Sequence, residues 1–386
     1  MALFAVAAVI HATQGVMLNC FISDYGLKAG AQGYAGSAES IGLILSVVLS
    51  ALILSKCTKA RALLMMAGLM ATVLPAVGCR PSYLILCGCY CVFGLSYGSV
   101  DALATSTISD LYPDRSGEIM AYSRAVYSIG GMTAPLVLSF FLNKGCKWNK
   151  VALGASVFGI LVFLYYLLVT SPKIPAASAD QNANDKISVR AFVTFARKQS
   201  AAVSLLFGLF FSGHQLALTI WIVRYISTYM DRPKWSTYAL TAYWSGALIT
   251  RLIVPRLKVP SKYLLAIGNL IGCMLLSIGI LSGDGRTMCI LVFLTGMAEG
   301  MSIPMLTEHV CGIDRKHSST ACSAVIVINS LGGVIFPWLI AKLTAACGAK
   351  TGIFVLPVTA AVCFVFAVCM FRKKRAELFE SSVGND

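Results

Sequence analysis

Long apolar stretches separated by short polar connections run along the whole chain. A helix that crosses a bilayer needs ~20 largely apolar residues. Stretches of this kind predict twelve membrane-spanning helices, at residues 1–22, 33–54, 62–79, 83–109, 118–141, 151–170, 199–223, 236–254, 263–281, 287–308, 320–341 and 352–371. The predicted fold class is therefore an all-α polytopic membrane protein.

One connection differs from the others in length and polarity. Residues 172–198 are polar and lie at the middle of the chain. This segment divides the prediction into an N-terminal six-helix half (1–171), a linker (172–198), a C-terminal six-helix half (199–371) and a tail (372–386). Residues 1–22 lack the basic start of a signal peptide, so we interpret them as the first spanning helix.

Composition points to lipid as the solvent of this chain. Of its 386 residues, 58% are hydrophobic and 12% are charged, whereas soluble domains average ~25% charged residues. The formal charge of +15 is spread between apolar runs, which does not resemble a nucleic-acid surface. We expect a lipid bilayer around the protein, no nucleic-acid partner, no cofactor and a monomer. Cys87, Cys89 and Cys91 cannot face one metal from a helix, so we expect no metal site.

Basic residues also predict how the chain is oriented. With the N-terminus inside, the inner segments carry more lysines and arginines than the outer ones, among them Lys56, Lys59, Arg61, Arg251, those of the linker and the run 372–375. Cytoplasmic connections are enriched in Lys and Arg. We therefore expect a multi-pass protein of the cell membrane, with both termini and the linker in the cytoplasm.

Several segments follow a pattern of glycine, proline and aromatic residues. Helix 4 contains Gly98, Asp101 and Thr105, and helix 5 contains Gly130, Gly131 and Pro135. Helices 7 and 8 contribute Gly213, Gln215, Trp221, Tyr225, Trp244, Gly246 and Arg251. Helices 10 and 11 contribute Gly296, Pro304, Gly332, Gly333 and Pro337.

In this order, these segments resemble the fucose/glucose–galactose symporter branch of the major facilitator superfamily. The chain departs from the branch pattern at Gln215, where the branch has Glu, and at Thr105, where it has Asn. Helix 1 also lacks the acidic residue of the fucose symporters. The resemblance implies two six-helix halves and proton-coupled transport of a small polar solute such as a monosaccharide, by alternating access.

Two other functions stay open. One is efflux of drugs or metabolites, since GGMTAPLVLS in helix 5 faintly resembles an antiporter motif. The other is a non-transporting receptor or scaffold, which would not need charges at membrane depth. An enzyme is not expected, because no nucleophile–base set, metal spacing or phosphate loop occurs at a helix end.

Ionisable side chains at membrane depth are candidates for proton coupling. Asp101 lies ~12 Å from the inner end of helix 4 and Arg124 lies ~9 Å into helix 5, at ~1.5 Å per residue. We expect the two to pair, and a proton can then compete with Arg124 for the carboxylate. A purely structural charge pair is the alternative.

Glu39 and Glu299 are further candidates for proton coupling. Glu39 could instead face an outer vestibule. Glu299 lies in a segment with Gly296, Gly300 and Pro304, where a broken helix would expose backbone groups to a cavity.

Neutral polar and aromatic side chains define the candidate solute site. We expect the solute between the halves near the midplane, touching helices 1, 4, 7, 10 and 11. The candidates are Gln14, Asn19, His214, Gln215, Trp221, Trp244 and Asn329. Hydrogen bonding between helices or plain packing is the alternative for each. His11 is interpreted as a helix residue with its hydrogen bonds satisfied.

Overall fold

The computed structural model describes residues 1–28, 31–54, 57–111, 116–170, 194–257, 261–313 and 318–383. Residues 171–193, most of the predicted linker, lie outside this range, so the domain boundaries stay predictions. Within the described ranges the regular elements are helices. Each of the twelve predicted segments is helical, in agreement with the predicted fold class.

The N-terminal half is built from eight α-helices and one π-helical turn. They are α1 (Ala2–Val16), α2 (Leu18–Tyr25), α3 (Tyr34–Leu54), α4 (Lys59–Ala71), α5 (Val73–Gly78), α6 (Tyr83–Leu111), α7 (Ser116–Asn143), α8 (Trp148–Tyr165) and η3 (Tyr166–Thr170). The predicted helices 1 and 3 are thus each interrupted, at Met17 and at Thr72.

The C-terminal half has a similar order of helices. They are α10 (Gln199–Arg224), η6 (Tyr225–Tyr229), α11 (Pro233–Leu257), α12 (Ser261–Ser282), α13 (Gly285–Glu299), α14 (Ser302–Ile313), α15 (Ser318–Cys347), α16 (Ala349–Ile353) and α17 (Val355–Val383). The last helix is longer than predicted, because α17 continues into the segment 372–386 that the sequence assigns to a tail.

Length and apolar composition make this a multi-pass membrane protein. In the described part of the chain, nine helices can span a bilayer on these criteria, or ten if α1 and α2, which are bent by 52°, form one span. The apolar segment Tyr34–Ser50 of α3 is shorter. Both α3 and α11 nevertheless pack along full spans, α3 against α6 and α11 against α13.

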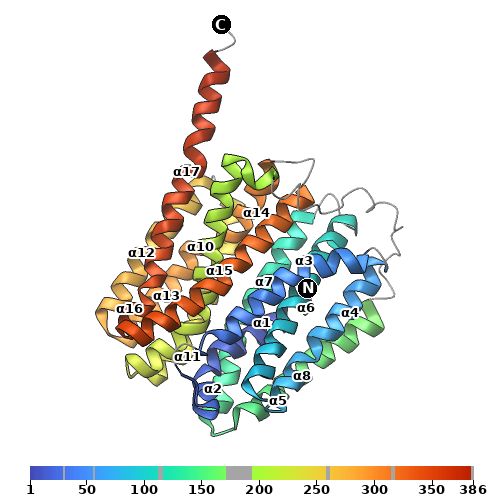
Figure 1. The fold of residues 1–386 in the computed structure, drawn as a ribbon, viewed down its shortest axis with the longest axis vertical. Coiled ribbons are helices and arrows are strands. Elements are labelled where there is room, and N and C mark those ends of the chain that lie inside the picture. The colour runs from blue at the N-terminus through green and yellow to red at the C-terminus, as the bar shows by residue number, and fades with distance from the viewer. Residues whose placement is uncertain are drawn as a thin grey trace.

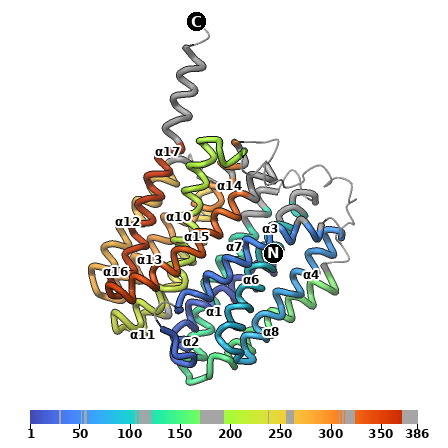
Figure 2. The backbone as a smooth tube through the Cα atoms, in the orientation of Figure 1, coloured from blue at the N-terminus to red at the C-terminus, as the bar shows by residue number. Residues whose placement is uncertain are grey.

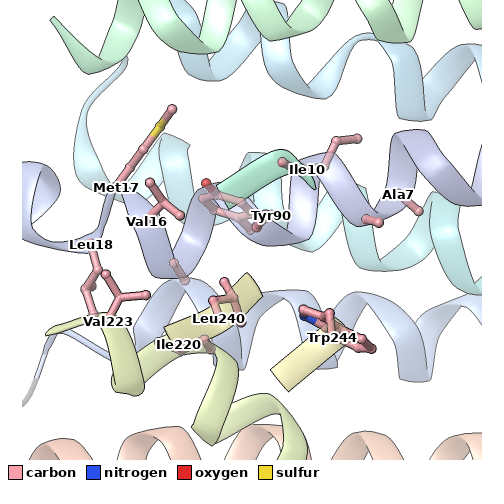
Figure 3. Packing of buried hydrophobic residues seen from close by; sticks show 14 of the residues in the cluster. Ala7, Ile10, Val16, Met17, Leu18, Tyr90, Ile220, Val223, Leu240 and Trp244 are labelled. Atoms are coloured by element: carbon pink, nitrogen blue, oxygen red, sulfur yellow. The ribbon is translucent and has the colours of Figure 1, made fainter. Parts of the chain in front are cut away.

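The helices form two groups that lie side by side, one running from blue to green and the other from yellow to red (Figure 1). The tube in Figure 2 follows the same two groups. They meet where α1 contacts α10, α3 contacts α15 and α7 contacts α11. Buried side chains from α1, α6, α10 and α11 belong to one apolar cluster that spans this contact (Figure 3).

Glycines bring the two halves into backbone contact. A Cβ atom at Gly15 of α1 would lie 2.3 Å from the carbonyl oxygen of Thr219 in α10. One at Gly33, just before α3, would lie 2.9 Å from the carbonyl oxygen of Pro337 in α15. Small residues allow helices in membranes to approach this closely. The close packing of the two halves therefore depends on the absence of a side chain at Gly15 and Gly33.

Candidate functional site

Asp101 and Arg124 form an ion pair between α6 and α7. Arg124 Nη2 donates to both carboxylate oxygens of Asp101, at 2.7 and 2.9 Å. The side chains remain 22% and 35% exposed, respectively. The guanidinium also lies over the ring of Phe4, 5.5 Å from its centroid. The pairing predicted from sequence is present, while its role in proton coupling stays a prediction.

A second arginine, Arg251 of α11, lies next to this pair and was not among the predicted site residues. Its Nε donates to the carbonyl of Gly300 (3.0 Å), and its Nη1 donates to Ser128 Oγ of α7 (2.6 Å). It therefore connects the two halves. From its position near a helix end, Arg251 is predicted to be one of the basic residues at the inner membrane surface. Its place in the Trp-x-Gly…Arg pattern was the signal that could have identified it.

Aromatic rings continue from the ion pair toward the other half. Tyr97 stacks on Tyr127, with ring centroids 5.9 Å apart and planes 25° apart. Tyr127 meets Trp244 of α11 edge-on, at 5.4 Å. Trp244, a predicted solute residue, is itself 5% exposed and packs against Gly131. A partly aromatic surface thus runs from Asp101 into the C-terminal half.

Gln215 and Asn329 are half-buried polar residues of the C-terminal half. Gln215 Nε2 donates to the hydroxyl of Tyr243 (3.1 Å). In the orientation that satisfies its neighbours, the Asn329 amide donates to the carbonyls of Gly208 (3.1 Å) and Val325 (3.2 Å). Both side chains retain some exposure, so both remain candidates for solute contact.

Trp221 and Asn19 lie in the contact between the halves. Trp221 is 2% exposed and donates its indole N–H to the carbonyl of Pro337 (3.2 Å). Asn19 accepts from Arg224 Nη1 (2.8 Å) and donates to Ser227 Oγ (2.9 Å). For these two residues the structure favours the alternative reading, hydrogen bonding between helices.

Glu39 lies in a network that joins α1, α3 and α10. It is 2% exposed, so it does not face an open vestibule here. Its Oε1 contacts His11 Nδ1 (3.1 Å), and Gln14 donates to its Oε2. His11 Nε2 in turn contacts Thr219 Oγ1 of the other half (3.1 Å). Both ring nitrogens of His11 have partners, so the interpretation of His11 as a helix residue with satisfied hydrogen bonds holds. The identity of these partners was not predicted, because adjacency to Glu39 depends on helix packing that sequence does not reveal.

Glu299 also has a histidine partner, deep inside the C-terminal half. His214 Nε2 lies 3.1 Å from Glu299 Oε2, and both side chains are fully buried. His214 Nδ1 contacts Thr359 Oγ1 and the carbonyl of Leu356, each at 3.0 Å. The predicted break is present, since α13 ends at Glu299 and α14 begins at Ser302. His214 was predicted to contact the solute, but its side chain is fully buried in this conformation.

A comparison with protein families identifies the family of this chain. Residues 1–259 match the model of the Major Facilitator Superfamily. The chain belongs to this superfamily. The superfamily is one of transporters, so the protein is a membrane transporter with a small-molecule substrate rather than an enzyme.

Other members of the superfamily resemble the chain over most of its length. The uncharacterized MFS-type transporter YfkL of Bacillus subtilis (strain 168) is 22% identical over 334 residues, which cover 83% of this chain and 82% of YfkL. The nucleoside transporter NupG has a TM-score of 0.77 at 14% identity, covering 96% of this chain and 98% of NupG. The fucose:proton symporter FucP of E. coli has a TM-score of 0.62 at 18% identity, and the match covers 95% of this chain and 98% of FucP. At these identities, the solved structures establish the fold alone.

Proposed function

We propose that the protein is a proton-coupled symporter of a small polar solute, with a monosaccharide as the solute class that fits best. The observation that carries this proposal is the half-exposed ion pair of Asp101 and Arg124 where the two halves meet. It stands beside the rings of Tyr97 and Tyr127 and the other half's Trp244.

The ion pair provides a way to couple a proton to a solute. A proton on Asp101 neutralises the carboxylate, and the bond to Arg124 then weakens. The freed guanidinium can donate to solute hydroxyls. Each conformation then holds the proton with a different affinity, which is the condition for a ligand to bias an equilibrium.

The surroundings of the pair suit a sugar. Binding sites for small molecules combine apolar and aromatic walls with a few placed polar groups. In the proposed site, Trp244 and the tyrosines would form the walls once the halves part, and Gln215 and Asn329 of the C-terminal half would add polar groups. A solved D-xylose–proton symporter has a similar fold, with a TM-score of 0.74 at 15% identity, covering 96% of this chain and 94% of that one. The sequence motifs are what supports assignment to the fucose/glucose–galactose symporter branch.

An uptake screen in proteoliposomes tests the proposed function. The purified full chain is reconstituted and offered a panel of radiolabelled monosaccharides, with and without an imposed pH gradient. We expect at least one sugar to accumulate only when the gradient is present. Failure of every sugar to accumulate, or accumulation that ignores the gradient, contradicts the proposal.

A further inference from the structure

The hydrogen bonds of His11 accommodate a proton on its Nε2. Thr219 Oγ1 lies 2.8 Å from the carbonyl of Leu216, to which it can donate its own proton. A hydroxyl has one proton to donate and lone pairs with which to accept. With its proton committed to Leu216, Thr219 Oγ1 accepts from a protonated His11 Nε2 across the 3.1 Å contact.

The contact between His11 and Glu39 then needs a second proton. With Nε2 protonated, a neutral imidazole has a bare Nδ1, and two acceptors would face each other at 3.1 Å. The proton lies either on Nδ1, giving an imidazolium beside a carboxylate, or on Oε1, giving a neutral pair. Both forms hold the same number of protons. In this arrangement the His11–Glu39 pair holds one proton more than a neutral imidazole beside a carboxylate, and it has no net charge. We call this the loaded pair.

The His214–Glu299 pair is loaded by the same reasoning. A backbone carbonyl cannot donate, so the carbonyl of Leu356 requires a proton on His214 Nδ1. The hydroxyl of Thr359 is committed to the same carbonyl (2.7 Å). The remaining contact, from Nε2 to Glu299 Oε2, again needs one further proton.

The two pairs differ in the hydrogen-bond partners of the glutamate. Both oxygens of Glu39 have a partner, His11 and Gln14. Glu299 Oε1 is buried without a hydrogen-bond partner among the described residues, and it packs against Gly272, where a Cβ would lie 2.1 Å away. Leaving a buried carboxylate oxygen unsatisfied is costly. Glu39 therefore has partners for both carboxylate oxygens, whereas Glu299 has a partner for one.

The pairs also differ in their position relative to the moving parts. His214, Glu299 and Thr359 all belong to the C-terminal half. The His11–Glu39 pair reaches from the N-terminal half to Thr219 of the other half, beside the backbone contact at Gly15. Separation of the halves must therefore break the bond from His11 to Thr219.

The other side chains near Glu39 include three tyrosines. Tyr90 and Tyr97 of α6 and Tyr127 of α7 lie close enough to Glu39 to interact with it electrostatically, and phenols are neutral at neutral pH. From α1 it meets His11 and the uncharged Gln14, and α10 contributes the uncharged Thr219.

We infer that His11 and Glu39 form a second proton site, whose proton is bound when the halves close over Thr219 and released when they part. This inference rests on the proposed function, to which it adds a proton beyond the one assigned to Asp101. Closing at α1 and α10 requires the loaded pair, so the site makes closure depend on pH.

The release step conserves atoms and charge. In the closed state the pair holds two acidic protons, one on Nε2 and one shared between Nδ1 and Oε1. When α10 withdraws, one proton passes to water. The other remains on Nδ1 and is donated to the Glu39 carboxylate, which Gln14 also stabilises. The pair then has a charge of −1, and Nε2 faces water as an acceptor.

Hydrogen–deuterium exchange tests this site without a solute. The purified full chain in detergent is labelled between pH 5 and pH 8, and protection of the α1–α2 amides is normalised to that of α12 and to intrinsic exchange rates. We expect protection of α1–α2 to fall as pH rises, by up to about tenfold per pH unit for a single linked proton. Glu39→Gln and, independently, His11→Gln should make protection independent of pH.

The matched control uses the other pair. Glu299→Gln should retain the pH dependence of α1–α2 protection, because that pair lies within one half. A parent protein whose protection ignores pH overturns the inference, as does a parental slope in both Glu39→Gln and His11→Gln. Asp101→Asn is expected to keep the slope even if it abolishes accumulation, so failure of this site and failure of the proposed function give different results.

Discussion

At the scale of single residues, Asp101 is a carboxylate that faces the guanidinium of Arg124 while remaining partly exposed. Asp101→Asn should abolish gradient-driven accumulation, because the amide cannot bind and release a proton as a carboxylate does. Solute exchange between preloaded vesicles should persist, since exchange need not release the proton. The measurement compares accumulation with exchange in the same vesicles. Parental accumulation by the variant would make Asp101 structural and leave Glu39 or Glu299 as the carrier.

Asp284 offers a matched control for that substitution. It caps the N-terminus of α13, where the backbone N–H and the hydroxyl of Thr287 donate to its carboxylate, each at 2.8 Å. These bonds hold the pKa of Asp284 below its usual range. A lowered pKa keeps the group ionised above about pH 4, and its contribution to stability is lost only as pH falls further. Asp284→Asn should therefore leave the pH profile of transport unchanged between pH 5 and pH 8.

The polar residues of the C-terminal half should differ from Trp221 in their effect on binding. Gln215→Ala and Asn329→Ala each remove one hydrogen-bonding group, worth about 0.5–1.5 kcal/mol, so affinity should fall roughly 2–10-fold with expression intact. Trp221→Ala removes a buried ring, which costs about 3–5 kcal/mol, and should lower thermal stability. Binding and melting measurements on the same samples separate these effects; unchanged affinity in both amide variants would move the site elsewhere.

Sequence was sufficient to select the charged residues but not all their partners. Asp101 and Arg124 lie on consecutive helices joined by a short connection, so their depths could be estimated from helical rise. Glu39 and Thr219 are far from His11 along the chain, and only the packing of α1 against α3 and α10 brings them together. Arg251 was predicted to lie at the inner membrane surface, but it binds Ser128 of the other half. Sequence cannot separate these cases, because a basic residue near a helix end occurs in both.

At the scale of helices, apolar length predicted where the chain crosses the membrane but not where helices break. The interruption at Glu299 was foreseen from its glycines and proline. The one at Met17 was not foreseen, although Gly15 lies two residues before it in an apolar run. Breaks of that kind arise from tertiary packing, here of α1 and α2 against α10, which hydropathy does not encode.

The backbone contact between α1 and α10 makes a prediction for Gly15. In Gly15→Ala, the new Cβ would lie 2.3 Å from the carbonyl oxygen of Thr219, so the two helices must separate. We expect lower protection of the α1–α2 amides at every pH. Gly88→Ala in α6 is the control, because nothing lies within 4 Å of its Cβ position. Equal protection in Gly15→Ala and the parent protein would show that the closed contact tolerates a methyl group.

At the scale of the whole molecule, the twelve spans predicted from sequence, with the bias of basic residues, predict that both termini and the linker face the cytoplasm. A cysteine introduced by Asp180→Cys should not react with an impermeant maleimide applied to intact cells. Cys79, Cys146 and Cys347 are exposed in the structure and lie at the predicted outer end, so they report successful labelling when peptides are resolved by mass spectrometry. Labelling at position 180 at the level of these three would invert the topology.

The glycine contacts also bear on how fast the halves can separate. Gly15 and Gly33 place backbone directly against backbone. Immobilising a flexible side chain can cost up to about 2 kcal/mol per residue, and docking at these glycines avoids that cost. Neither opening nor closing then has to wait for interlocked side chains to rearrange. A change of one pH unit is worth about 1.4 kcal/mol per linked proton. It reverses which conformation predominates wherever the two differ in free energy by less than this amount.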